Sequence, residues 1–143
     1  MTTIAYRDFT LAADTLSVTA GIPCRCTKLF RLDDGRVVGF AGNVDAWRLF
    51  LAWLRAGGEA PRFTDKDREN FHALVMHPDG LVDEWESERI AIPLEDPFYA
   101  IGSGRKAAMA AMHMGADAAR AVEVAKLCDA DTGGPVMVMR CAC

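Results

Sequence analysis

Residues 2–14 of the chain read TTIAYRDFTLAAD. The runs 3–7 and 11–14 are short and largely apolar, and the polar Asp8 lies between them. Two strand-like runs so close together predict a tight β-hairpin at the start of the chain. The N-terminus is therefore expected to lie in a sheet.

The elements that we expect after this hairpin are strands and helices in mixed order. Apolar runs bounded by Gly, Pro and Asp turns predict extended segments, and apolar residues at i, i+3, i+4 and i+7 predict helices. In chain order they are an extended run over 24–32, a strand over 37–41, a helix built on Trp47, Phe50, Leu51 and Leu54, strands over 71–76, 81–85, 89–92 and 98–101, helices over 105–114 and 118–127, and a strand over 135–140. This order favours an α+β domain with helices layered on antiparallel sheets.

Capping and turn residues set the bounds of several of these elements. Asn43 and Asp117 are placed to cap the first and third helices at their N-termini, and Gly57 ends the first one. The sequence HPDG over 77–80 predicts a hairpin turn between two strands. The polar segment 59–70 contains a proline, so we expect a loop or a single helical turn there.

Length and composition indicate one compact domain over residues 1–143. Of the 143 residues, 51 % are hydrophobic and 25 % are charged, which is close to the average of globular proteins. The net charge of −4 and the lack of a basic run argue against nucleic acid and anionic membranes as partners. The first residues do not resemble a signal peptide, and no segment is long enough to span a bilayer. We therefore expect a cytoplasmic protein.

The five cysteines do not predict a disulfide framework, because their number is odd and cytoplasmic thiols stay reduced. Cys24 with Cys26, and Cys141 with Cys143, would each put two thiols on one face of a strand. Four thiolates suit zinc, but the usual spacing has two or more residues between the ligands. We therefore predict no metal site.

The three histidines are not arranged with a serine or a cysteine in the pattern of a catalytic triad. They are His72, His77 and His113. We expect them on the surface or in loops.

Six short motifs run from one end of the chain to the other. They are TTI (2–4), LAAD (11–14), TK (27–28), VGFAG (38–42), AIGSG (100–104) and DADTGGPV (129–136). In order and spacing they resemble the proteasome β-subunits and HslV, a family of threonine peptidases among the N-terminal-nucleophile hydrolases. The resemblance implies a four-layer αββα sandwich and a peptidase that needs no cofactor.

The resemblance gives Thr2 the role of nucleophile once Met1 has been removed. In this family the hydroxyl of an N-terminal threonine attacks the peptide bond, and its own α-amino group is the general base. An α-amino group has a pKa of about 7.7–8.0, so part of it is neutral at cytoplasmic pH. Removal of Met1 is chemically reasonable because the next residue is small.

The resemblance also places Lys28 beside the threonine, Asp14 beside Lys28, and Gly42 as an oxyanion donor. A lysine charge there would disfavour protonation of the amine. Gly42 ends a strand before a helix, so its N–H can point towards a developing oxyanion. Taken alone, Asp14 and Lys28 could form an ordinary surface ion pair, and Gly42 could be a plain turn residue.

Ser103, Asp129 and Thr132 match the family positions that surround and orient the threonine amine. Without the resemblance, Ser103 would be read as a helix cap, and Asp129 and Thr132 as loop residues. Cys26 and Phe40 are candidates for the pocket that receives the substrate side chain, since they flank the nucleophile along two expected strands. Both could instead be core residues.

The resemblance implies peptide or unfolded-protein substrates, a homo-oligomeric ring and an ATP-dependent unfoldase as a possible partner. The chain departs from the family over 59–70, where relatives carry a second long helix. That difference leaves ring contacts and unfoldase binding open. Two alternatives remain, which are a catalytically silent ring-forming or binding protein and a small-molecule amidase of the same fold.

Overall fold

The secondary structure comes from a computed structural model, which describes residues 2–141. The strands are β1 (Thr3–Arg7), β2 (Thr10–Ala13), β3 (Leu16–Thr19), β4 (Ile22–Arg25), β5 (Leu29–Arg31), β6 (Val37–Gly42), β7 (Phe71–Met76), β8 (Val82–Trp85), β9 (Ala91–Pro93), β10 (Phe98–Gly102) and β11 (Met137–Arg140). The helices are α1 (Val44–Ala56), α2 (Asp65–Arg68), α3 (Arg105–His113) and α4 (Ala118–Cys128). The chain is therefore α+β, as the sequence predicted.

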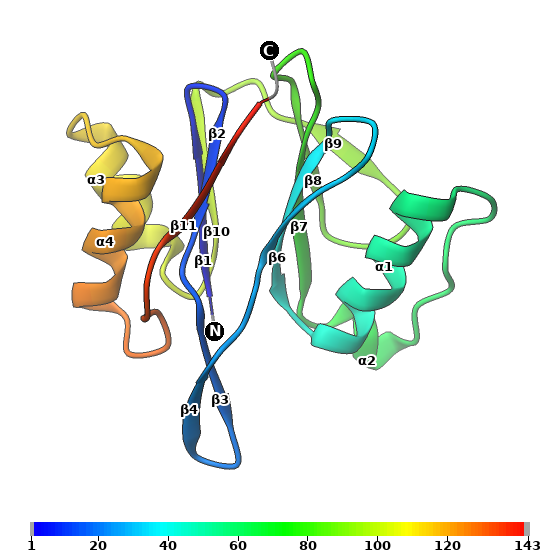
Figure 1. The fold of residues 1–143 in the computed structure, drawn as a ribbon, viewed down its shortest axis with the longest axis horizontal. Coiled ribbons are helices and arrows are strands. Elements are labelled where there is room, and N and C mark those ends of the chain that lie inside the picture. Colours follow the sequence, from blue (N-terminus) through cyan, green and yellow to red (C-terminus); the bar gives the residue numbers. More distant parts are fainter. Residues whose placement is uncertain (1, 142–143) are drawn as a thin grey trace.

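Two antiparallel sheets lie face to face between helices. One has the strand order β10-β1-β2-β11 and the other β5-β6-β7-β8-β9, while β3 and β4 form a separate pair. Figure 1 shows α3 and α4 outside the four-stranded sheet and α1 outside the five-stranded sheet. One buried cluster fills each of the three spaces between these layers.

The first hairpin is confirmed, with β2 beginning one residue earlier than expected. Arg7 pairs with Thr10, so only Asp8 and Phe9 form the turn. Their φ angles are 49° and 58°, and two positive φ angles in a two-residue loop match the twist of the flanking strands. The register pairs Ile4 with Ala13, which brings the N-terminus next to the end of β2.

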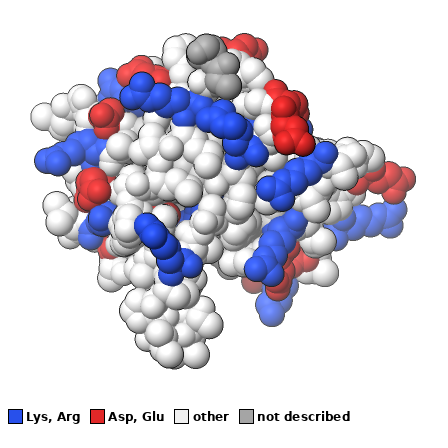
Figure 2. Space-filling model, in the orientation of Figure 1, with Lys and Arg blue, Asp and Glu red and all other residues white. Residues whose placement is uncertain are grey.

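The single extended run expected over 24–32 is wrong. Strand β4 is the second half of a hairpin with β3, and β5 begins only at Leu29. The turn of this hairpin is Ala20-Gly21, where both φ angles are positive. The hairpin extends beyond the two sheets in Figure 1, and its end carries no acidic or basic residue in Figure 2.

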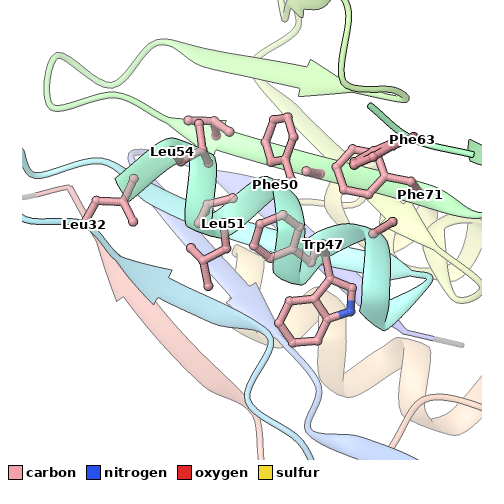
Figure 3. Close-up of a cluster of buried hydrophobic side chains, with 12 residues drawn as sticks. Leu32, Trp47, Phe50, Leu51, Leu54, Phe63 and Phe71 are labelled. Carbon is pink, nitrogen blue, oxygen red and sulfur yellow. The ribbon is translucent and has the colours of Figure 1, made fainter. Parts of the chain in front are cut away.

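Helix α1 begins and ends where the sequence predicted. The side chain of Asn43 accepts hydrogen bonds from two backbone N–H groups of the first turn, and Gly57 follows the last residue. Its apolar face, seen in Figure 3, packs on the five-stranded sheet around Phe40 and Phe71. Burial of Phe50 is complete, so truncating it to alanine should cost about 3–5 kcal/mol.

On the opposite side, small residues let α3 and α4 lie close to the four-stranded sheet. The cluster there contains Ala5 and Ala12 of the sheet and Ala108, Ala121 and Ala125 of the helices. The Asp117 side chain caps α4 by accepting from Arg120, as predicted. The bounds of both helices agree with the prediction to within one residue.

The remaining elements differ from the prediction mainly at their ends. Segment 59–70 contains only the four-residue α2, a single helical turn with a capping box between Thr64 and Asp67. Strands β8, β9 and β11 begin one or two residues later than expected. Within residues 2–141, no helix is both long enough and apolar enough to cross a membrane.

Candidate active site

Thr2 lies directly before β1, a strand of the four-stranded sheet. Thr2 is only 3 % exposed, and Thr3 is fully buried. A pocket beside Thr2 is also lined by Lys28 and Gly42, which precede β5 and end β6 respectively. The fold therefore gathers three of the predicted catalytic residues around one small hollow.

Asp14 is the most heavily hydrogen-bonded side chain of this region. Its carboxylate is fully buried, and Oδ1 accepts from the Nζ of Lys28 and from the backbone N–H of Thr3, both at 3.0 Å. Oδ2 accepts from the backbone N–H groups of Leu16 at 3.3 Å and Gly133 at 3.1 Å. One carboxylate thus ties the backbone of β1, through Thr3, to Lys28 and to the loop before β11.

Lys28 is buried as well, with 5 % of its side chain exposed. Besides Asp14, its Nζ donates to the backbone carbonyl of Leu16 at 2.6 Å. A charge removed from water needs such compensation, because an unpaired buried ion costs several kcal/mol. The pair is therefore not the surface ion pair that the sequence left open.

A second network joins Thr2 to two other loops, the one after β10 and the one after α4. The backbone nitrogen of Thr2 donates to Ser103 Oγ at 3.0 Å, and Ser103 Oγ donates to Asp129 Oδ2 at 2.6 Å. The hydroxyl of Thr132 donates to the same carboxylate oxygen at 2.6 Å. Since Thr132 has spent its only proton there, the 2.7 Å contact between Thr3 and Thr132 has Thr3 as the donor.

Asp129 is the anionic end of this second network. Partial burial opposes ionisation, but the hydrogen bonds from Ser103, Thr132 and the backbone of Asp131 act against it, and the pKa of Asp129 lies below its ordinary value. The carboxylate is therefore charged at neutral pH. It fixes the hydroxyl of Ser103 as a donor towards itself, which leaves the Ser103 oxygen to accept from Thr2.

Gly42 is required by the backbone at the end of β6. Its φ is +91°, and a Cβ there would lie 1.3 Å from the carbonyl oxygen of Asn70. Any side chain would therefore collide with the segment before β7. The residue lines the pocket with Thr2 at the point where the chain enters α1.

Apolar side chains form most of the remaining pocket wall. Cys26 and Phe40, the two predicted pocket residues, both line it. Sequence reasoning missed the others, which are Leu16, Ser17, Val18, Val44, Trp47 and Asp131. The helical spacing predicts Trp47 as a core residue of α1, and its ring does stack on Phe40 with 5.2 Å between the ring centroids.

The cysteines are not gathered at one place among the described residues. Cys24 and Cys128 are exposed, Cys26 is partly buried, and Cys141 is buried. The thiol of Cys141 donates to the carbonyl of Pro78. Cys143, the second residue of the C-terminal pair, lies outside the described residues.

Two of the three histidines lie where they were expected. His113 is exposed at the end of α3, and His77 lies in the turn after β7. His72 lies in strand β7 and not in a loop; it is partly exposed, and its Nε2 lies 2.6 Å from Glu84 Oε1. The sequence already places His72 in a strand, because β7 has the bounds that were predicted for it.

Comparison with known proteins finds similarity in structure but not in sequence. No protein-family model matches the chain, and no curated protein matches it. A structure of Thiobacillus denitrificans BPH in complex with epoxomicin is similar with a TM-score of 0.67 and 22 % identity, over 99 % of each chain. Eukaryotic HslV from Trypanosoma brucei has a TM-score of 0.67 and 22 % identity, over 97 % of this chain and 98 % of that one.

The similarity covers 97–99 % of this chain and shows that it has the fold of these HslV-like structures. The identity of 22 % is too low to carry over a reaction. What this chain does has to be argued from its own residues.

Proposed function

We propose that this protein is a threonine peptidase of the proteasome and HslV type, with Thr2 as the N-terminal nucleophile after removal of Met1. The observation that carries the proposal is the surroundings of Thr2. Its nitrogen lies 3.0 Å from Ser103 Oγ, and the Thr2 pocket also contains the buried Lys28. Residues 1–143 are taken as one domain, an αββα sandwich of the N-terminal-nucleophile class.

Removal of Met1 would convert the Thr2 nitrogen from an amide into an amine. The amine could then take the proton of the Thr2 hydroxyl as the oxygen attacks the carbonyl carbon of the peptide bond. Proton transfer to the leaving nitrogen would break the C–N bond and leave an ester on Thr2. Water, activated by the same amine, would hydrolyse that ester and restore the hydroxyl.

Two groups of opposite charge would act on this amine. Lys28 favours the neutral, basic form by repulsion, while Asp129 acts through Ser103 to hold the amine in position. Gly42 is assigned as the backbone donor to the oxyanion. Thr132 supports Asp129, and Asp14 supports Lys28, so both are positioning residues in this proposal.

The pocket beside Thr2 would receive the side chain that precedes the cleaved bond. Cys26 and Phe40 belong to its mainly apolar lining, together with Val18 and Trp47. Such a lining favours an apolar side chain, because an acidic one would lose its hydration beside Asp131, and the charge of Lys28 is already paired with Asp14.

We further propose that the substrates are peptides or unfolded proteins and that the chain forms a homo-oligomeric ring, with an ATP-dependent unfoldase as a possible partner. The support is the resemblance and the shared fold. Light scattering on the purified protein tests the ring, and a stable monomer would contradict it.

The first experiment is intact-mass measurement of the protein made in its native host. We expect a mass that lacks Met1. If Met1 is retained, Thr2 has no free amine, and the proposal is contradicted for the protein as its native host makes it.

The second experiment compares peptide turnover by the processed wild type, Thr2→Ala and Thr10→Ala. Thr10 is a matched control because it lies in the same hairpin at the far end from the site. We expect turnover to vanish only in Thr2→Ala. Epoxomicin, which BPH binds, should stabilise the wild type and Thr10→Ala against heat but not Thr2→Ala.

The same assay separates the two alternatives. A silent ring-forming protein would turn over neither peptides nor small amides. A small-molecule amidase would hydrolyse small amides alone, and its activity would still require Thr2.

A further inference from the structure

Three side chains with metal-binding atoms meet on the inner face of the five-stranded sheet. They are His72 of β7, Glu84 of β8 and Glu86, just after β8. Leu74 pairs with Glu84 and lies in the cluster between the sheets, and His72 is two residues away on the same face. The strand pairing therefore directs the three side chains to one place.

The distances suit a single divalent ion. One ligand atom from each residue lies within 4.8 Å of the other two. Tetrahedral zinc with ligands at about 2.1 Å needs about 3.4 Å between ligand atoms. His72 Nε2 is 3.7 Å from Glu86 Oε1 and 2.6 Å from Glu84 Oε1, so an ion would replace the hydrogen bond to Glu84 with a small outward shift.

Burial and hydrogen bonding prepare Glu84 for this role. Its side chain is 9 % exposed, and Tyr99 of β10 uses it as a hydrogen-bond acceptor. A carboxylate oriented by a donor behind it is typical of metal ligands.

The nearby arginines do not neutralise these carboxylates. Arg68 and Arg105 line the same hollow as His72 and Glu86. Arg68 is paired with Glu88, and Arg105 donates to the carbonyl of Gly102 at 3.1 Å. Among the ion pairs of residues 2–141, neither arginine is paired with Glu84 or Glu86.

We propose that His72, Glu84 and Glu86 form a binding site for a divalent transition-metal ion of the zinc class. One imidazole and two carboxylates are the donor set that zinc, cobalt and manganese accept. His72 and Glu86 line a hollow that also reaches Ser103 and Gly42, so water or a ligand in the hollow can complete the site. The proposal does not depend on peptidase activity.

Metal-free, untagged protein titrated with Co²⁺ and Zn²⁺ tests this site without an activity assay. We expect one Co²⁺ per chain, with a visible spectrum that lacks the intense thiolate-to-cobalt band, because the five cysteines are the competing ligands. We expect His72→Gln and Glu86→Gln to weaken Zn²⁺ binding at least about tenfold. Glu86 is 68 % exposed in its side chain, so its substitution leaves the fold intact.

His77→Gln is the matched control. His77 Nε2 lies 2.7 Å from Asp83 Oδ2, so this variant removes a similar histidine–carboxylate pair at the other end of β7. Its zinc affinity should equal that of the wild type. A thiolate band, wild-type affinity in both test variants, or an equal loss in His77→Gln would overturn the proposal.

Discussion

The carboxylate of Asp14 lies 3.0 Å from the Nζ of Lys28, and both side chains are almost completely buried. The two residues come from opposite sheets, since Asp14 follows β2 and Lys28 precedes β5. Three backbone N–H groups also donate to this carboxylate. The pair therefore links the two sheets directly beside Thr2.

Removing the charge of Lys28 should destabilise the fold. Lys28→Met leaves Asp14 buried with no cation, which should cost about 3–5 kcal/mol of unfolding free energy. Lys126→Met is the control, because the Lys126–Glu123 pair is partly exposed on α4. That change should cost less than about 1 kcal/mol. Urea unfolding measures both changes. Equal losses of unfolding free energy would show that the Asp14–Lys28 pair stabilises the fold no more than an exposed ion pair does.

Acid should remove the contribution of Asp129 to stability. Its folded-state pKa lies below the ordinary value, so its contribution is complete above an unfolded-state pKa of about 3.9 and is lost as the pH falls through the folded-state pKa. Asp129→Asn should therefore lose stability less steeply below pH ~4 than the wild type. Unfolding by urea at several acidic pH values measures this slope.

The control for this pH dependence is Asp131→Asn in the same loop. The backbone of Asp131, not its side chain, bonds to Asp129, so this variant should keep the wild-type slope. An unchanged slope in Asp129→Asn would contradict the prediction.

A methyl group at Gly42 should not be tolerated. Gly42→Ala meets both an unfavourable φ of +91° and the carbonyl of Asn70. Gly57→Ala meets only the unfavourable φ, which is +71°, because nothing lies within 4 Å of the added Cβ. We expect about 1–3 kcal/mol of strain in Gly57→Ala. Thermal unfolding should show a clearly larger loss of stability in Gly42→Ala. Similar losses in the two variants would show that the backbone at Asn70 moves away from the added methyl group at little cost.

The pocket beside Thr2 should prefer apolar side chains. Peptides with leucine before the cleaved bond should have kcat/KM values roughly 10–200 times those with aspartate. Cys26→Asp puts a charge into the pocket wall and should reduce that ratio. Cys24→Asp, two residues away and exposed, should not change it. A ratio near one in the wild type would mean that this pocket does not select the substrate.

Ser103 should matter for turnover more than for stability, since it is exposed but bonded to Thr2. Ser103→Ala removes the acceptor of the Thr2 nitrogen, and the kcat of peptide hydrolysis should fall about 10–100-fold. Ser87→Ala is the control, because the Ser87 hydroxyl also accepts a hydrogen bond from a backbone N–H, that of Arg89, but in an exposed turn. If Ser103→Ala loses no activity, the network through Asp129 does not orient the amine.

Local signals in the sequence determined most of the elements. The first hairpin, α1 between Asn43 and Gly57, and strand β7 follow from turn, cap and spacing patterns that lie within a few residues. The β3–β4 hairpin escaped prediction because Pro23 argues against a strand, and all of β4 is exposed, so no alternation of burial marks it.

The candidate site could be proposed only through the ordered motifs, and the tertiary structure decided how its parts meet. Thr3 contacts Thr132, which is 129 positions away, because β1 pairs with β2 and β2 with β11. The pocket role of Trp47 and the meeting of His72 with Glu86 likewise come from packing between elements. Hydrophobic pattern and turn chemistry are local properties of a sequence, whereas contacts across two facing sheets exist only once the strand order and register are set.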